Sequence, residues 1–392
     1  MAMATKTQNY SRTHEKLHTG FSDHLTPLKP LDLNKIKKFS DLTDAMSQTA
    51  FGGRLVGEAV ETLVQMSKDK DTFVILTLSG AMTVAKMGLL VTEMIEKGLV
   101  NAVISTGALM AHGLVESQGM SHFKVPHNMD DKEMYLAGYN RVYDTIELEQ
   151  NLDNTEEMFF KILDKIDPEK VLSSRFLNEE IGKYLSKNTK HRGILKSAYE
   201  KGVPVFVPAF TDSELGLDLA LYNRLRLDEG QKIRKFDPFL DLEHYSHLID
   251  KQKKIGIFTI GGGVPRNWAQ QVTCYLDIIE QRKAVRSEKS VKAKMEKEPL
   301  MFSYGLRICP EPVEWGGLSG CTYTEGISWG KFQPHELGSR FCEVPADATI
   351  VWPLILKSAL EKLGKKKIKK NIFAGKKAVK EIEEIVEATY KF

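Results

Sequence analysis

The stretch IGIFTIGGGVPRN, residues 255–267, decides the fold of this chain. Its first six residues form an apolar run rich in β-branched and aromatic side chains, which predicts a strand buried on both faces. The triple glycine Gly261–Gly263 follows where that strand ends, and Pro265 stands where the next helix begins. Such glycines make either a tight turn or a cradle in which backbone amides approach a phosphate. The residues after Gly263 do not complete the GxGxxG fingerprint, so the stretch alone leaves both interpretations open.

The same alternation of strand and helix recurs along the chain. Strand-like runs lie at residues 72–78, 99–105, 203–208, 255–260, 301–304 and 341–344. A strand, a helix and a second strand with short links form a right-handed βαβ unit, and runs that are apolar on both faces indicate a parallel sheet. We therefore expect an α/β fold with five or six parallel strands and helices on both faces of the sheet.

We expect one large domain with two appendages. Residues 1–49 are predicted to form an N-terminal arm and connector, residues 50–363 the α/β domain, and residues 364–392 a lysine-rich C-terminal tail and helix. Between the strands, residues 155–201 are amphipathic with helical spacing, which favours packing on a face of the sheet.

Composition excludes several classes of protein. The chain has 392 residues, of which 42% are hydrophobic, which excludes a miniprotein, a fibrous chain and a wholly disordered chain. The net charge of +3 hides a gradient, because residues 356–381 hold ten lysines and two glutamates and leave the rest of the chain at −5. A nucleic-acid partner would depend on that segment alone. A solvated lysine-rich helix face or linker is the favoured interpretation, so we expect no nucleic-acid partner.

The sequence also predicts no membrane partner and no export. No window holds about 18 apolar residues, and the first 25 residues contain no apolar signal segment. The four cysteines lack the CxxC spacing, which indicates reduced thiols in a cytoplasmic protein, without disulfides and without a metal site. They are Cys274, Cys309, Cys321 and Cys342.

The segment GISWGKF, residues 326–332, has some of the features of a phosphate-binding P-loop. It is one residue short between its glycines, and Phe332 stands where a magnesium-binding Ser or Thr is needed, which excludes an ATPase. Lys331 beside Trp329 suggests other chemistry. In a partly dry aromatic pocket the pKa of the ammonium falls, and the neutral amine can form an imine. An exposed, unreactive lysine is the alternative.

Further polar residues follow predicted strands. His112, after the second strand, is either a catalytic group or a satisfied structural histidine. Asp212 and Asp347 either cap the next helix or bind the ribose of a cofactor. The aromatic and acidic residues around Trp315 and Trp329 could enclose a polyamine cation, although the same spacing is typical of ordinary packing.

In their order along the chain, several motifs resemble those of the deoxyhypusine synthase family. They are Thr106-Gly107, GYNR (138–141), PVFVPAFTDSELG (204–216), IGGGVPRN (260–267), GGLSG (316–320), EGISWGK (325–331) and ADATIVWPL (346–354). The resemblance spans roughly residues 50–363, and SWGK is its most specific motif. It implies a Rossmann-like NAD-binding fold and a homotetramer whose cofactor sites lie between paired subunits.

The resemblance also implies roles for individual residues. In the family, NAD oxidises spermidine, the lysine of SWGK captures the aminobutyl group as an imine, and an acceptor amine receives that group. Lys331 matches this lysine, Trp329 matches the tryptophan that lines the polyamine slot, and Glu325 matches a substrate carboxylate. The positions that match cofactor contacts are Ser79, Thr106, Gly107, Asp212, Gly261, Gly262, Gly263, Asp347 and Ala348.

The chain departs from the eukaryotic members of the family at substrate positions. Ala111 and His112 replace an acidic pair, Leu217 and Leu318 replace two aspartates, and Asn267 replaces a histidine. We therefore expect the cofactor chemistry to be kept and the amine pocket to be rebuilt. Asn267 and Asp218 are the predicted substrate contacts in that rebuilt pocket, with Glu214 as a further displaced carboxylate.

These observations predict an NAD-dependent aminobutyl transferase that acts on a polyamine through an imine on Lys331, with His112 as a second catalytic candidate. The expected acceptor is a small amine, which gives a homospermidine-type product. Three alternatives stay open: a deoxyhypusine synthase that modifies a protein lysine, an enzyme for a less cationic amine such as agmatine, and an NAD-binding scaffold without catalysis.

Overall fold

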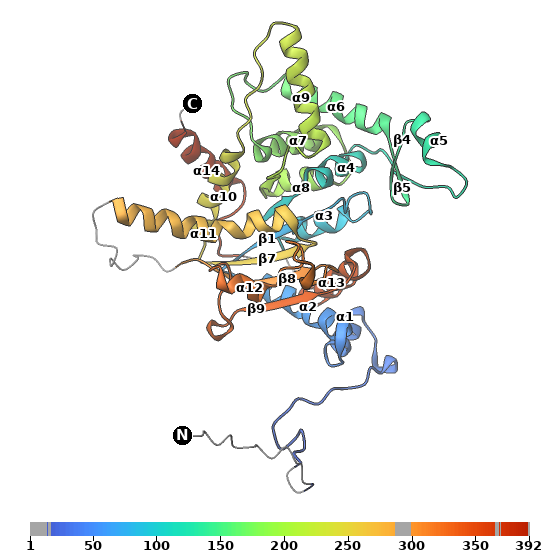
Figure 1. The fold of residues 1–392 in the computed structure, drawn as a ribbon, viewed down its shortest axis with the longest axis vertical. Coiled ribbons are helices and arrows are strands. Elements are labelled where there is room, and N and C mark those ends of the chain that lie inside the picture. The colour runs from blue at the N-terminus through green and yellow to red at the C-terminus, as the bar shows by residue number, and fades with distance from the viewer. Residues whose placement is uncertain (1–13, 15–16, 287–298, 365–367, 369, 391–392) are drawn as a thin grey trace, which may run out of the picture.

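Six parallel strands form the centre of the molecule (Figure 1). The computed structural model describes residues 14, 17–286, 299–364, 368 and 370–390. In spatial order the strands are β6 (Val205–Phe206), β2 (Ala102–Ser105), β1 (Thr72–Leu78), β7 (Lys254–Ile260), β8 (Phe302–Ile308) and β9 (Arg340–Val344). Every neighbouring pair is parallel. When only the six strands of this sheet are numbered along the chain, their spatial order is 3-2-1-4-5-6, which is the strand order of the Rossmann fold. The predicted α/β class is therefore confirmed.

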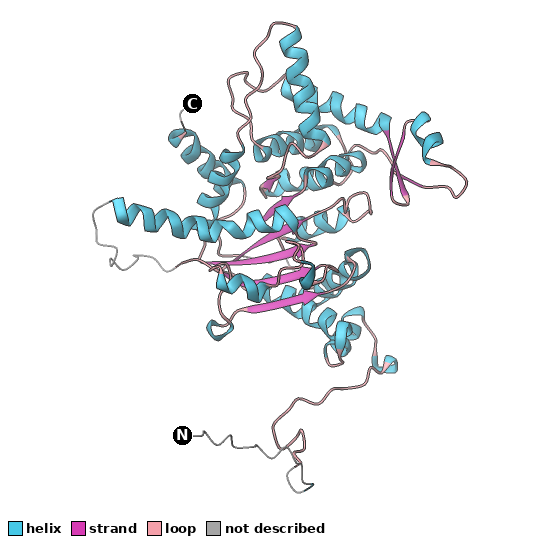
Figure 2. Cartoon of the chain, viewed as in Figure 1, coloured by secondary structure: helices cyan, strands magenta, loops and turns pink. Residues whose placement is uncertain are grey.

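Alternate residues of the central strand β1 face two separate cores, because side chains along a strand point to opposite faces. Val74 and Leu76 belong to one core, whereas Phe73 and Ile75 belong to the other. The first core is covered by α2 (Phe51–Lys68), α3 (Gly88–Lys97), α4 (Gly107–Ser117), α6 (Glu149–Leu163), α7 (Ser174–Asn188), α8 (Ile194–Lys201), α9 (Glu214–Asp228) and α13 (Ala348–Leu363). The second is covered by α10 (Pro238–Asp250), α11 (Gly263–Arg286) and α12 (Tyr323–Ser328). Helices therefore cover both faces of the sheet, as predicted (Figure 2).

A second, antiparallel sheet was not predicted from the sequence. Its strands are β3 (Phe123–Lys124), β5 (Thr145–Leu148) and β4 (Tyr139–Val142), in that spatial order. Together with the short helix α5 (Asp131–Leu136) it stands beside the main body, next to α4 and α6 (Figure 1). The GYNR motif lies here, because residues 139–141 are part of β4.

The N-terminal region enters the body through a short helix. A 3-10 turn, Leu33–Lys35, precedes α1 (Phe39–Ser47), which packs against α2 and α13. Thr43 Oγ1 and Ser358 Oγ are hydrogen-bonded at 2.5 Å in this contact. The segment predicted as arm and connector thus contains a helix of the packed body, whereas its residues 1–13 and 15–16 lie outside the described residues.

The described part of the lysine-rich C-terminal segment is integrated into the fold. Helix α14 (Lys376–Thr389) packs on α10, where Ile382 and Val386 are buried. Lys370 Nζ donates to the carbonyl oxygens of Met66, Asp69 and Thr72 at 3.0, 2.8 and 3.1 Å. Burial lowers the pKa of Lys370 to about 8, with the nearby charge of Asp69 acting in the opposite direction. The interpretation of this segment as a solvated face or linker is therefore wrong for Lys370 and for the buried side of α14.

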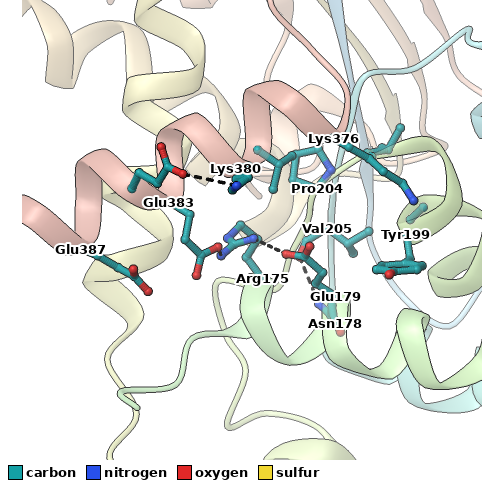
Figure 3. Close-up of a pocket in the computed structure, with 15 residues that line it drawn as sticks. Arg175, Asn178, Glu179, Tyr199, Pro204, Val205, Lys376, Lys380, Glu383 and Glu387 are labelled. Carbon is teal, nitrogen blue, oxygen red and sulfur yellow. Dashed lines mark hydrogen bonds and ion pairs between the residues drawn. The ribbon is translucent and has the colours of Figure 1, made fainter. Parts of the chain in front are cut away.

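A cavity of about 500 Å³ lies between α7, α8 and α14 (Figure 3). Arg175, Tyr199 and Glu383 are among its lining residues. Arg175 pairs with Glu179 on the same helix and with Glu383 on α14. Val205, at the start of β6, also lines the cavity, so the cavity lies at the amino end of that strand. The nine predicted cofactor residues belong to the opposite edge of the sheet. None of the described helices is long and apolar enough to cross a membrane.

Candidate functional site

The loops that leave β1 and β7 meet where the strand order reverses, which is where Rossmann folds bind their ligands. Ser79 Oγ accepts a hydrogen bond from Gly262 N at 2.9 Å and donates to Ile260 O at 3.3 Å. Gly261 has a φ of 75°, in the left-handed region that favours glycine. A Cβ atom on Gly262 would lie 2.4 Å from Ser319 Cα. This turn therefore needs its glycines, and it leads directly into the amino end of α11.

Two more helices begin at the same edge of the sheet. Thr106 Oγ1 donates to Gly80 O at 2.7 Å and joins the loops after β1 and β2. Gly107 opens α4, and a Cβ atom there would lie 2.3 Å from Ser213 Cβ, so the loop after β6 also touches this point. Ala348 opens α13 after β9. Helix amino ends carry partial positive charge and free N–H groups, which suit the phosphates of a dinucleotide.

The capping alternatives for the two aspartates have different outcomes. Asp347 Oδ1 accepts from Thr349 N at 2.7 Å, so Asp347 caps α13, as one interpretation predicted. The capping interpretation of Asp212 is wrong, because its neighbour Ser213 caps α9 by accepting from Gly216 N at 3.3 Å. Asp212 is exposed beside this cap.

All nine predicted cofactor residues lie in loops or helix starts after β1, β2, β6, β7 and β9, at the carboxyl edge of the sheet. The close backbone approach at Gly262 and the helix starts at Gly107, Gly263 and Ala348 fit a bound dinucleotide. Contact of each residue with NAD stays a prediction.

Lys331 lines a cavity of about 220 Å³ between α11 and α12, together with Trp329, Glu325 and Asn267. Lys331 Nζ donates to Asn267 Oδ1 at 3.4 Å and lies 5.6 Å from the centroid of the Trp329 ring. Its backbone is fixed to β8, because Phe302 N donates to Lys331 O at 2.9 Å. The structure thus brings four of the six predicted catalytic and substrate residues into one cavity.

The environment of Lys331 lowers the pKa of its amine. Burial is the largest cause, and the positive charge of Arg266 acts in the same direction, against the thiol of Cys274 and the carboxylate of Glu325. Arg266 is itself buried and donates to Leu318 O at 3.2 Å. A larger fraction of Lys331 is therefore neutral, and nucleophilic, near neutral pH than for an ordinary lysine.

One side of this cavity is open in a single chain. The Trp329 side chain is 66% exposed and Leu318, also in the lining, is 52% exposed. The expectation of a pocket dried by tryptophan is thus met only in part by one copy of the chain. Large apolar side chains so exposed at a cavity rim are typical of surfaces that another chain covers.

The other two predicted residues, His112 and Asp218, do not line the Lys331 cavity. Asp218 lies on α9, four residues after Glu214. Burial raises the pKa of Asp218 to about 7, with the charges of Glu156 and Glu214 as further causes. The predicted substrate residues therefore form two groups in a single chain, one beside β7 and β8 and the other beside β2 and β6.

His112 is buried between two carboxylates. Its Nδ1 lies 3.2 Å from Glu147 Oε2, and its Nε2 lies 3.4 Å from Glu214 Oε1. Burial lowers the pKa of His112, but the Glu147 hydrogen bond and the charges of Glu214 and Glu147 outweigh it, so the net shift is upward. Glu147 itself was missed from the sequence, because it lies on β5 of the unpredicted sheet. The catalytic role of His112 stays a prediction.

Comparison with known proteins agrees with this architecture. The family model described as deoxyhypusine synthase matches residues 41–359. The "Probable deoxyhypusine synthase 2" of Methanosarcina acetivorans is 31% identical over 346 residues, which cover 88% of this chain and 92% of that protein. The "Deoxyhypusine synthase-like protein" of Chlorobaculum parvum is 30% identical over 338 residues, 86% of this chain and 90% of that protein.

A solved structure shares the fold. The Entamoeba histolytica protein crystallised as a "putative deoxyhypusine synthase" superposes with a TM-score of 0.55 at 15% identity, covering 88% of this chain and 100% of that one. The extent of the family match and the identity to its relatives are sufficient to assign the chain. It belongs to the deoxyhypusine synthase family.

Proposed function

We propose that this chain is an NAD-dependent aminobutyl transferase that acts on a polyamine, such as spermidine, through an imine on Lys331. The observation that carries the proposal is the partly buried Lys331 amine, whose pKa is lowered, in a cavity with an aromatic ring and a carboxylate. The family assignment supports the class of reaction, because members of the family are aminobutyl-transferring enzymes. As in the family, the enzyme is expected to work in the cytoplasm.

The carboxyl edge of the sheet, where the nine predicted cofactor residues lie, is the proposed NAD site and is called the cofactor edge below. The turn at Gly261–Gly263 and the helix starts at Gly107 and Ala348 would bind its phosphates, and the exposed Asp212 would take a ribose hydroxyl. When bound, NAD supplies the acceptor for a hydride from the C–N carbon of the amine, and it later returns that hydride.

The Lys331 cavity supplies the covalent step. The Glu325 carboxylate and the face of Trp329 attract the cationic amine. The neutral Nζ of Lys331 adds to the oxidised carbon, forms a new C–N bond and displaces the rest of the polyamine as a diamine. Asn267, which accepts from Nζ at 3.4 Å, orients this attack. The acceptor amine then displaces Lys331 by the same exchange and takes the aminobutyl group.

A small amine is the proposed acceptor, with a homospermidine-type product. Leu217 and Leu318, which replace two aspartates of the eukaryotic enzymes, are exposed apolar side chains. They leave fewer charges to hold spermidine in the eukaryotic manner, while Asp218 and Glu214 offer displaced carboxylates on α9. A protein lysine as acceptor, a less cationic donor such as agmatine, and a non-catalytic NAD scaffold are the competing proposals.

The proposal also includes self-association of the chain as a homotetramer. The predicted substrate residues fall into two separate groups, and the rim around Trp329 is open in one chain. A homotetramer with sites between paired subunits would bring the Asp218 group of one copy to the Lys331 cavity of another. Size measurement in solution tests this arrangement, and a monomer that retains full activity would contradict it.

The decisive experiment is chemical trapping. The chain is incubated with NAD and labelled spermidine, reduced with borohydride and mapped by mass spectrometry, with Lys331→Arg as the control that keeps the charge but cannot form the imine. We expect an aminobutyl adduct on Lys331 alone. Absence of an adduct over a panel of polyamines, with NAD bound, would favour the scaffold. Product analysis with and without putrescine then separates acceptors, because a homospermidine product requires the added diamine.

A further inference from the structure

Two imidazoles and one carboxylate converge in the interior beside α4. They belong to His112 on α4, His122 just before β3, and Glu147 on β5, and all three residues are buried. One nitrogen or oxygen from each lies within 4.8 Å of the other two. Glu147 Oε2 is 3.2 Å from His112 Nδ1 and 2.6 Å from His122 Nε2. Three separate elements of the chain thus place two nitrogens and an oxygen around one point.

His122 Nε2 is a buried nitrogen without a hydrogen-bond partner among the described residues. It is close to Glu147 Oε2, but the contact does not have the alignment of a hydrogen bond. His122 Nε2 and Glu147 Oε2 thus approach to 2.6 Å without a hydrogen bond between them, and an ion held between the two atoms would satisfy both. An orphaned polar atom of this kind is costly unless something binds it.

The surroundings orient the other two groups for the same purpose. Glu147 Oε1 accepts from Asn151 Nδ2 at 2.7 Å and from Leu148 N at 3.1 Å, which leaves Oε2 for another ligand. His112 Nε2 faces Glu214 Oε1 at 3.4 Å, which leaves Nδ1 toward the cluster. Metal-bound histidines usually donate their second ring N–H to a carboxylate in this way.

Lys86 is the fourth neighbour of the cluster. Its Nζ lies 2.7 Å from His122 Nδ1 and 2.8 Å from Glu116 Oε1. Coordination through Nε2 places the ring proton of His122 on Nδ1, so Lys86 must then turn to Glu116 alone. The Lys86 side chain is partly exposed and has the freedom to do so.

We propose that His112, His122 and Glu147 bind one divalent transition-metal ion, with Zn²⁺ as the best match. Zn²⁺ binds histidine nitrogen and carboxylate oxygen at about 2.0–2.2 Å, which in a tetrahedron separates neighbouring ligand atoms by roughly 3.3 Å. The 3.2 Å pair already fits, and the 2.6 Å pair has to open by less than about 1 Å. Water takes the fourth position. Two imidazoles disfavour Mg²⁺ and Ca²⁺, which prefer oxygen ligands.

The ion ties the antiparallel sheet to α4, because its ligands come from both. It also fixes the ring of His112, whose opposite nitrogen faces Glu214 at the start of α9. The proposal gives His112 a positioning role in place of the catalytic role that the sequence suggested. It also departs from the sequence-based expectation of no metal site, which considered only the cysteines.

The test is a titration of the full-length, chelator-treated chain with Co²⁺, whose visible absorption bands intensify in a tetrahedral site. We expect saturation at one equivalent per chain, loss of the bands on addition of Zn²⁺, and no effect of Mg²⁺. Absence of the bands in folded protein overturns the proposal.

Variants assign the site. Glu147→Gln and His122→Gln are expected to weaken Co²⁺ binding by more than about 100-fold. Asn151→Leu removes the hydrogen bonds to Glu147 Oε1 and Ser121 O but no ligand, and should weaken binding by about 10-fold. The matched control is His247→Gln, since His247 also lies near a glutamate, with Nδ1 3.8 Å from Glu243 Oε2, but has no second histidine. It should bind Co²⁺ like the wild type. If His122→Gln does not fold, Asn151→Leu decides, and unchanged affinity there contradicts the site. Trapping on Lys331 uses none of these residues, so the two proposals can fail separately.

Discussion

Ser79 and Gly262, in the loops that follow strands β1 and β7, are joined by a 2.9 Å hydrogen bond from the Gly262 N–H to the Ser79 hydroxyl. This bond lies where the connections diverge to opposite sides of the sheet. It fixes the glycine turn against the loop after β1, so the cofactor edge is already ordered by contacts within the chain.

The first prediction concerns Gly262. Replacement by alanine places a Cβ atom 2.4 Å from Ser319 Cα, so the turn must shift. We expect NAD to bind Gly262→Ala at least about 10-fold more weakly, equivalent to about 1.4 kcal/mol, as measured by calorimetry. Gly52→Ala is the control, because a Cβ atom at Gly52 meets nothing within 4 Å. Equal affinity of both variants would remove the turn from the cofactor site.

The second prediction concerns the pH dependence of trapping. Because the pKa of Lys331 is lowered, chiefly by burial, its neutral fraction rises with pH and reaches its plateau earlier than that of an ordinary lysine. Adduct formation on Lys331 should therefore increase with pH and level off below the pH at which exposed lysines become reactive. Acylation of exposed lysines in the same digest provides the reference. Coincident profiles would show that the cavity does not activate Lys331.

The third prediction concerns Asp218. Its folded-state pKa of about 7 is above the unfolded value of about 3.9, so the folded chain binds more protons between these values and loses stability as pH rises through them. Asp218→Asn should therefore raise the melting temperature at pH 8 but not at pH 3.5. The expected gain is about 1 kcal/mol, less than the full shift implies, because Asp218 is partly exposed and screened. Asp228→Asn, at the exposed end of α9, should change neither melting temperature.

The fourth prediction concerns Lys370. Replacement by methionine keeps most of the apolar stem of the side chain but removes the amine that donates to the carbonyls of Met66, Asp69 and Thr72. We expect a loss of about 2–4 kcal/mol in the free energy of unfolding, measured by urea denaturation. Lys377→Met is the control on the exposed side of α14. If the two variants are equally stable, the C-terminal segment is only an appendage.

The parallel sheet could be predicted because its strands are buried on both faces and therefore read as continuous apolar runs. All seven residues of β1 are buried, which is the signal that residues 72–78 gave. The antiparallel sheet gave no such signal, because β4 is largely exposed and β3 has only two residues. Because this sheet was not predicted, Glu147 on β5 was not predicted as a site residue either. Its importance depends on contacts with His112 and His122, which lie on other elements of the chain.

The sequence predicted that a polar side chain caps each of these helices, but it did not always identify the residue that does so. Asp347 caps α13 as one interpretation held, whereas at α9 the cap is Ser213 and not Asp212. Adjacent residues with similar capping propensity cannot be separated by sequence alone, since the backbone angles decide between them. Likewise the burial of Lys370 has no local signal, because the three carbonyls it meets come from residues some 300 positions earlier.

The near-contact between Gly262 and Ser319 also bears on the coupling between the two ligands. Ser319 follows Leu318, which lines the Lys331 cavity, and Arg307 donates to both Ser319 O and Cys321 O, so this loop is a stiff wall. The other side of the same wall is the glycine turn. A dinucleotide that displaces the turn would push on this wall, so we expect the affinity for the amine to differ with and without the dinucleotide, as calorimetry of the amine in its presence and absence would measure.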